Sequence, residues 1–272
     1  HKRSGSEVHL FLLPGPPREL RPMFHESVLP ILHTVVPGGS AKECRTFRIA
    51  GVGESVVEAA VGPQLLALPE VELGYCARLG EVDVRVLGPE SALAEAERLL
   101  RGAFPSSIFT TANETLEEVV VSMLAEKNET VATAESCTGG YLASRLTNVP
   151  GASKVFLGGY VPYSNASKIA ALGVEASLLQ EHGAVSVPVC RAMAERALNI
   201  TGATHALATT GIAGPGGGSA EKPVGTVCFA LASATRETNV QQRRILAERE
   251  SFKRLVSQYT LELLRQRLLG LG

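Results

Sequence analysis

A short segment at residues 134–140, AESCTGG, combines hydroxyl and thiol side chains with glycine at the point where an apolar strand should end and a helix begin. Ligands of open α/β sheets bind beyond the carboxyl ends of strands. Free N–H groups at a helix start also attract an anion or an oxyanion. Ser136, Cys137 or Thr138 could supply a nucleophile or hydrogen bonds there, or the segment could only cap a helix.

A second segment, residues 158–168, reads GGYVPYSNASK and again follows a predicted strand. Its candidate groups are Tyr163 and Lys168. A lysine kept neutral by burial can act as a base toward a serine, and a tyrosine hydroxyl can relay a proton or orient the pair. The alternative is a surface turn with a solvated lysine, since lysine is rarely buried.

A third segment, residues 209–218, reads TTGIAGPGGG, with Lys222 close behind it. Five glycines in eight residues can wrap a phosphate with backbone donors, helped by the hydroxyl of Thr210 and by Lys222. The segment matches neither the triphosphatase pattern G-x-x-x-x-G-K-[ST] nor a dinucleotide fingerprint at a helix start. The alternative is a flexible loop without a ligand.

The composition excludes several classes of function. The 272 residues carry 26 Lys and Arg against 27 Asp and Glu, so a nucleic-acid binder that depends on a basic field is not expected. No apolar run approaches the ~18 residues of a membrane span, and no signal-peptide core follows the N-terminus. The five cysteines are odd in number and lack C-x-x-C pairs, so we expect no disulfide framework, no zinc site and a cytoplasmic location.

Other catalytic patterns are missing from the sequence. The six histidines have no H-x-x-x-H or H-x-H spacing, which leaves a dedicated metal site unsupported. There is no G-x-S-x-G elbow, so a hydrolase triad of that type is unsupported as well. Cys137 remains an alternative nucleophile to Ser136, although neither His182 nor His205 is obviously placed to activate it.

The order of the predicted elements divides the chain into three parts. Residues 1–43 hold a strand at 9–13, a proline-rich turn and a short helix, which is too little for a domain. Residues 44–112 read strand, helix, strand, strand, helix, which indicates a small α+β module. Residues 113–272 alternate strands and helices, which predicts a layered α/β domain with a partly parallel sheet.

Periodicity places the elements of the last two parts. In the α+β module we expect strands at 46–50, 73–77 and 82–86, a helix at 56–68 that Pro63 breaks or bends, and a helix opened by Pro89. A capping box formed by Thr115 and Glu118 begins the next helix. The elements expected after it are residues 130–134, a helix to Leu146, and residues 155–160, 188–198, 205–209, 224–232 and 252–268.

Together, AESCTGG, GGYVPYSNASK and ATTGIAGPGGG with EKPVGTV resemble the C-terminal domain of the competence/damage-inducible protein A (CinA) family. The resemblance covers about residues 115–272. The α+β module resembles the KH-like middle domain of that family, although its residues 51–54 lack the G-x-x-G spacing and basic flanks of an RNA-binding KH loop. Residues 13–24 resemble the end of a molybdopterin-binding-like N-terminal domain, whose metal-dependent ADP-ribose pyrophosphatase activity we do not expect here.

The resemblance implies an amidohydrolase that converts nicotinamide mononucleotide into nicotinate mononucleotide and ammonia, in pyridine nucleotide recycling, without a metal or other cofactor. It implies Ser136 as the nucleophile, Lys168 as its general base and Tyr163 as an assisting group. Backbone N–H groups of residues 137–140 are the expected oxyanion donors. The residues expected to bind this small-molecule substrate are Thr138, Gly139, Gly140, Asn165, Thr210, Gly211, Gly214, Gly216 and Lys222. We also expect a homo-oligomer, with no membrane or nucleic-acid partner.

The sequence departs from the family pattern at two places. Val187 stands where the family has glutamate, and residues 251–254, SFKR, stand where a Gly-Asp-Arg start to the last helix is expected. An arginine that reaches the substrate phosphate would then be missing, or Lys253 or Arg254 would replace it. A catalytically silent nucleotide-binding or regulatory protein is therefore the main alternative. A phosphohydrolase acting on ADP-ribose is a third, which would need metal ligands.

Overall fold

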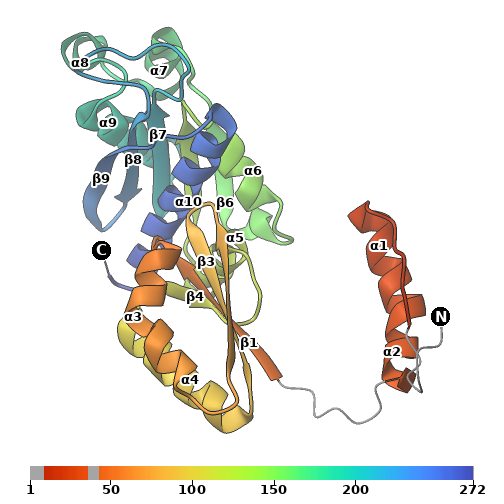
Figure 1. Ribbon diagram of the computed structural model, residues 1–272. Coiled ribbons are helices and arrows are strands. Elements are labelled where there is room, and N and C mark those ends of the chain that lie inside the picture. The colour runs from red at the N-terminus through yellow and green to blue at the C-terminus, as the bar shows by residue number, and fades with distance from the viewer. Residues whose placement is uncertain (1–8, 36–42, 272) are drawn as a thin grey trace. The chain divides into compact units, whose positions relative to one another are not determined.

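The computed structural model describes residues 9–35 and 43–271, and the chain forms two compact units, His1–Glu43 and Cys44–Gly272 (Figure 1). In the first unit, helix α1 (Pro17–Met23), a π-helical turn (Phe24–Val28) and helix α2 (Leu29–Val35) follow one another. The predicted strand at residues 9–13 is wrong, because this segment is irregular and pairs with no strand in the described part of the chain. Its assignment to the remnant of a larger domain stays a prediction.

The second unit begins with the α+β module, whose four strands follow the order β2-β3-β1-β4. The predicted order of elements is confirmed, and β4 is an added strand of three residues. Proline does not end helix α3, which continues through Pro63 to Leu66. The elements are β1 (Glu43–Ala50), α3 (Glu54–Leu66), β2 (Glu72–Arg78), β3 (Glu81–Gly88), α4 (Glu90–Ala103) and β4 (Ile108–Thr110).

The remaining residues build a five-stranded sheet with the order β6-β5-β7-β8-β9. The three strands β6, β5 and β7 are parallel, whereas β8 and β9 are antiparallel, so the predicted partly parallel α/β sheet is confirmed. The polar strand β9 escaped prediction because an edge strand needs no continuous apolar pattern. The strands are β5 (Val131–Glu135), β6 (Phe156–Tyr160), β7 (His205–Gly211), β8 (Thr226–Ser233) and β9 (Arg236–Arg244).

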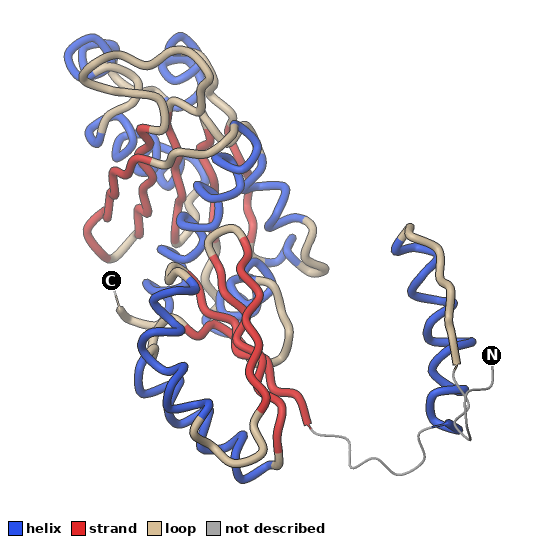
Figure 2. Tube along the Cα trace, viewed as in Figure 1, coloured by secondary structure: helices blue, strands red, loops and turns tan. Residues whose placement is uncertain are grey.

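Helices cover both faces of this sheet (Figure 2). Larger side chains such as Leu207, Phe229 and Leu231 face α5 (Leu116–Lys127), α6 (Tyr141–Thr147) and α10 (Arg249–Leu268). The opposite face consists mainly of alanines, and against it pack α7 (Asn165–Leu172), α8 (Ala176–His182) and α9 (Val187–Thr201). Small side chains on that face allow a close approach of the helices. No helix among the described residues is both long and apolar enough to cross a membrane.

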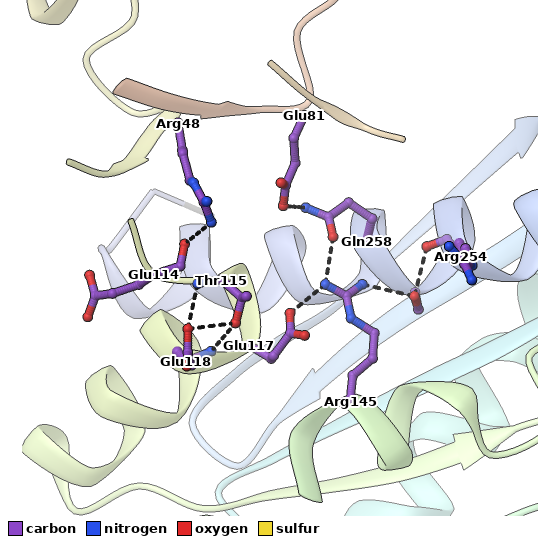
Figure 3. Close-up of polar contacts among 10 residues, drawn as sticks. Arg48, Glu81, Glu114, Thr115, Glu117, Glu118, Arg145, Arg254 and Gln258 are labelled. Atoms are coloured by element: carbon purple, nitrogen blue, oxygen red, sulfur yellow. Dashed lines mark hydrogen bonds and ion pairs between the residues drawn. The ribbon is translucent and has the colours of Figure 1, made fainter. Parts of the chain in front are cut away.

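A polar network joins the α+β module to the five-stranded domain (Figure 3). Gln258 on α10 donates to Glu81 of β3 at 2.5 Å and accepts from Arg145 of α6 at 2.7 Å. Arg145 also donates to Glu117 at 2.6 Å. Burial raises the pKa of Glu81, which the amide of Gln258 opposes by donating to its carboxylate. Gln258 therefore connects the charged side chains of both modules.

Gln258→Ala should lower the free energy of unfolding by about 2 kcal/mol, because both Glu81 and Arg145 lose a buried hydrogen-bond partner. A urea titration measures the loss. Arg254→Ala is the matched control on the same helix, since Arg254 pairs with Glu250 at the surface and should cost less than about 0.5 kcal/mol. Equal losses in the two variants would contradict the assigned role of Gln258.

Candidate active site

Two adjacent parallel strands position the hydroxyl and the amine that the sequence analysis singled out. Ser136 directly follows β5, and Lys168 lies on α7, soon after β6. The two strands pair in register, with Ala134 opposite Tyr160, so their carboxyl ends lie at one edge of the sheet. The Nζ of Lys168 lies 3.2 Å from the Oγ of Ser136 and donates to the carbonyl of Pro162 at 3.1 Å. The two residues, 32 positions apart, thus meet.

The amine of Lys168 is almost completely buried, with 1% of the residue exposed. Burial lowers its pKa from 10.5, and a smaller interaction with Cys137 acts in the opposite direction. Among the described residues, no carboxylate pairs with Lys168. A neutral amine in this position keeps one N–H for Pro162 and offers its lone pair to the hydroxyl of Ser136. The pair can therefore work as nucleophile and base.

Cys137, the alternative nucleophile, borders the same cavity as Ser136, but its side chain packs among apolar groups. It is 5% exposed and packs in a cluster with Val227, Phe252 and other apolar side chains. Burial raises the pKa of its thiol to about 12, so the reactive thiolate is strongly disfavoured. These properties favour a structural role for Cys137.

Glu135, which the sequence analysis did not single out, fixes the turn that carries Ser136. Its buried carboxylate accepts hydrogen bonds from the backbone N–H groups of Gly140 at 3.0 Å, Leu142 at 2.9 Å and Ala143 at 2.8 Å. A carboxylate at a helix N-terminus satisfies N–H groups that lack intrahelical partners. The sequence signal that could have indicated this role is an acidic residue between an apolar strand and a glycine turn.

This network narrows the set of possible oxyanion donors. The N–H of Gly140 is bound to Glu135, and the N–H of Gly139 donates to the carbonyl of Ser136 at 3.2 Å. Of the expected donors at residues 137–140, Cys137 and Thr138 remain. Gly139 and Gly140 instead shape the turn, with φ values of 62° and 90° that favour glycine.

A cavity of about 210 Å³ lies next to the Ser136–Lys168 pair. Six of the predicted site residues line it, namely Ser136, Tyr163, Asn165, Lys168, Thr210 and Gly211. The hydroxyl of Thr210 donates to the carbonyl of Ala184 at 2.8 Å, which holds another part of the wall in place. The cavity has the size of a site for a small molecule or for one ring of a larger ligand.

The other predicted binding residues lie outside this lining. Thr138 shares a buried hydrogen bond of 2.7 Å with Thr209. Lys222 donates to the carbonyl of His182 at 2.5 Å, which ties the glycine-rich loop to the end of α8. Gly214 accepts a hydrogen bond from Arg249, and Gly216 is exposed in the loop. Thr138, Gly214 and Lys222 thus hold neighbouring segments through hydrogen bonds and do not line the cavity.

Arg249 is the main functional candidate that the sequence analysis missed. The last helix was expected near residue 252, but α10 begins at Arg249, and this side chain lines the cavity. It donates to the hydroxyl of Tyr163 at 2.7 Å and to the carbonyl of Gly214 at 3.0 Å. Arg254 instead pairs with Glu250. Arg249 is therefore an arginine in the wall of this cavity, whereas the amine of Lys253 lies close to the backbone of Gly139 in the turn after Ser136.

Tyr163 was expected to assist the Ser136–Lys168 pair, and Val187 was noted as a departure from the family pattern. The hydroxyl of Tyr163 is bound to Arg249, so its nearest described partner is a cation at the cavity wall and not the Ser136–Lys168 pair. Val187 begins α9 and packs against the apolar cluster on the alanine face of the sheet.

Within residues 9–35 and 43–271, no three His, Cys, Asp or Glu residues gather as metal ligands.

Comparisons with known proteins agree with this division of the second unit. Residues 113–268 match the family described as the CinA C-terminal domain, and residues 44–103 match the damage-inducible protein CinA KH domain. A CinA-like protein of Akkermansia muciniphila is 46% identical over 95% of this chain and 62% of its own length. A putative competence-damage inducible protein of Symbiobacterium thermophilum is 40% identical over 96% of this chain and 65% of its own.

Solved structures share the fold of more than half of this chain. Competence/damage inducible protein CihA from Agrobacterium tumefaciens is 39% identical, with a TM-score of 0.54 over 55% of this chain and 91% of that one. A CinA superfamily protein from Klebsiella pneumoniae is 32% identical, with a TM-score of 0.55 over 57% and 96%. This chain spans less than two thirds of the length of the curated relatives named above. The resemblance in the sequence is thus confirmed, and the chain belongs to the CinA family.

Proposed function

We propose that this chain hydrolyses the carboxamide of nicotinamide mononucleotide to nicotinate mononucleotide and ammonia. The observation that carries the proposal is the 3.2 Å contact between the buried amine of Lys168 and the hydroxyl of Ser136 at the wall of a small cavity. A carboxamide is a weak electrophile, so its hydrolysis needs an activated nucleophile. A serine with a neutral lysine as base meets this need without a metal ligand.

The first half of the reaction forms an acyl-enzyme. The Oγ of Ser136 attacks the carboxamide carbon while its proton passes to the lone pair of Lys168. The tetrahedral intermediate carries its negative charge on the former carbonyl oxygen, for which the N–H groups of Cys137 and Thr138 are the candidate donors. When the C–N bond breaks, the leaving nitrogen takes the proton from Lys168 and departs as ammonia.

The second half of the reaction returns the enzyme to its starting state. Water attacks the acyl carbon and gives a proton to the neutral amine of Lys168. The bond between that carbon and the Oγ of Ser136 then breaks, and the serine recovers its proton from the lysine. Nicotinate mononucleotide leaves with the new carboxylate oxygen, so one amine serves as base and acid in both halves.

Arg249 is the group best placed to bind the phosphate of the mononucleotide. Its guanidinium stands at the cavity wall and is already oriented by Tyr163 and by the carbonyl of Gly214. Phosphate oxygens match the fork of N–H donors that a guanidinium presents. In this proposal Asn165 and Gly211, which line the same cavity, contact the remainder of the substrate.

Ser136→Ala should reduce ammonia release from nicotinamide mononucleotide by at least ~10³-fold, because the acyl-enzyme can no longer form. Cys137→Ala is the matched control, since the neighbouring thiol is buried and protonated and its loss should change turnover by less than about threefold. Unchanged turnover in Ser136→Ala would show that Ser136 is not the nucleophile. Calorimetric binding of the mononucleotide by the unaltered chain without ammonia release would select the silent, regulatory alternative.

Arg249→Ala should raise the KM for the mononucleotide about 30-fold, the equivalent of roughly 2 kcal/mol for hydrogen bonds to a charged group. Steady-state kinetics measures this, and kcat should change less because Arg249 contacts neither Ser136 nor Lys168 in the structure. Arg249→Lys should recover only part of the loss, since an ammonium is not bidentate. Lys253→Ala and Arg254→Ala test the positions first expected from the sequence, and an effect there larger than at Arg249 would contradict the assignment.

A further inference from the structure

A second hydrogen-bonded group of chemically active side chains lies at the other end of the five-stranded sheet. His205 opens β7, the strand whose carboxyl end lies next to Ser136, and Ser233 closes the antiparallel strand β8 beside it. The Nδ1 of His205 is 2.9 Å from the Oγ of Ser233, and its Nε2 is 2.7 Å from a carboxylate oxygen of Glu129. The mononucleotide reaction proposed above uses none of these residues.

The proton positions in this group follow from its chemistry. An ionised Glu129 can only accept, so the proton of the neutral imidazole lies on Nε2, and Nδ1 is left as an acceptor for the hydroxyl of Ser233. Burial lowers the pKa of His205, although Glu129 opposes the change and Arg267 and Arg236 add to it. A neutral histidine held by a carboxylate and bonded to a serine is the arrangement of a nucleophile, its base and the group that orients the base.

Arg267 adds a cation to the same serine. Its Nη1 donates to the Oγ of Ser233 at 3.0 Å, and its Nη2 donates to the carbonyl of Glu237 at 3.2 Å. The residue is 6% exposed, and its Nε has no hydrogen-bond partner within residues 9–35 and 43–271. A cation beside the hydroxyl favours the alkoxide that attacks a carbonyl, and the unpaired Nε is a donor still to be satisfied.

A cavity of about 250 Å³ opens at this group, and Glu129, His205, Ser233 and Arg267 all lie in its wall. Lys127 and Arg236 line it as well, so its wall contains three cationic side chains and one carboxylate, that of Glu129. A substrate with a negative group would be retained there, and the volume limits it to a small molecule.

We propose that Ser233, His205 and Glu129 form a second nucleophilic site, which hydrolyses small carboxylic esters that carry a negative charge. The Oγ of Ser233 bonds to the ester carbon while its proton moves to Nδ1 of His205. The C–O bond to the alcohol then breaks, and the alcohol leaves with that proton. Water, deprotonated by His205, releases the acid and restores the serine. The mononucleotide reaction at Ser136 does not depend on this site.

The test uses a fluorophosphonate probe on the full chain carrying Ser136→Ala, which removes the first nucleophile. The Oγ of Ser233 should displace fluoride and form an O–P bond, and tandem mass spectrometry should locate the adduct at Ser233. Adding His205→Asn should slow labelling by about 100-fold, the usual contribution of a general base. Ser122→Ala, at an exposed serine of α5, is the control and should label at the unaltered rate.

Two outcomes would overturn the proposal. If Ser233 is not labelled in the folded Ser136→Ala chain, or is labelled equally fast with His205→Asn, the group only ties the strand ends together. The first outcome is measured in the Ser136→Ala chain, whose second site is unaltered. A folding defect of the His205→Asn variant therefore cannot produce it. Circular dichroism checks the fold of each variant.

The substrate class has its own measurement. In the Ser136→Ala chain, release of 4-nitrophenolate from 4-nitrophenyl hydrogen succinate should exceed release from the neutral 4-nitrophenyl acetate by about tenfold. Lys127→Gln should reduce this preference. Equal rates for the two esters would overturn the anionic class, and no release from either would overturn the hydrolytic step.

Discussion

The removal of the Lys168 amine from water is the physical constraint on which the site depends. A buried ammonium is costly unless it is paired with an anion, and no carboxylate among the described residues faces Lys168. The structure provides instead a carbonyl, that of Pro162, and a hydroxyl, that of Ser136. Both suit a neutral amine. Burial, which disfavours the charged form of Lys168, favours the neutral form that can act as a base.

The surrounding fold maintains this environment from several directions. The pairing of β5 with β6 sets the distance between the two segments, and the carboxylate of Glu135 holds the turn at Ser136 by three backbone N–H groups. On α7, the side chain of Ser164 caps the helix by accepting from the N–H of Ser167, one residue before Lys168. The nucleophile and its base therefore rest on separate elements that are each fixed locally.

Much of the fold followed from local patterns in the sequence. The capping box at Thr115 and Glu118 and the alternation of strands and helices predicted the domain class, because these signals depend on neighbouring residues. The segment at residues 9–13 was misjudged since apolar residues form a strand only where a partner strand satisfies their backbone. The polar edge strand β9 was missed for the opposite reason, as its stability comes from pairing with β8.

The candidate site likewise contains some residues that local sequence patterns predict and others that they do not. Ser136 and Lys168 could be paired from their motifs, because parallel strands must end at a common edge. Arg249 could not be recognised, since the polar residues before Phe252 gave no apolar period to mark the helix start, and its contacts with Tyr163 and Gly214 are distant in sequence. The sequence predicted too many oxyanion donors, because the hydrogen bonds that Glu135 accepts are visible only in three dimensions.

The titration of Lys168 itself is the most direct measurement of this base. Nitrogen-15 NMR of the chain with labelled lysine, with the Lys168 resonance assigned by comparison with Lys168→Arg, follows its amine across the alkaline range. The burial of the amine predicts a midpoint clearly below the ordinary value of 10.5. The lowered pKa enlarges the fraction of neutral amine that can take the proton of Ser136. A midpoint at or above 10.5 would contradict the assignment of Lys168 as the base.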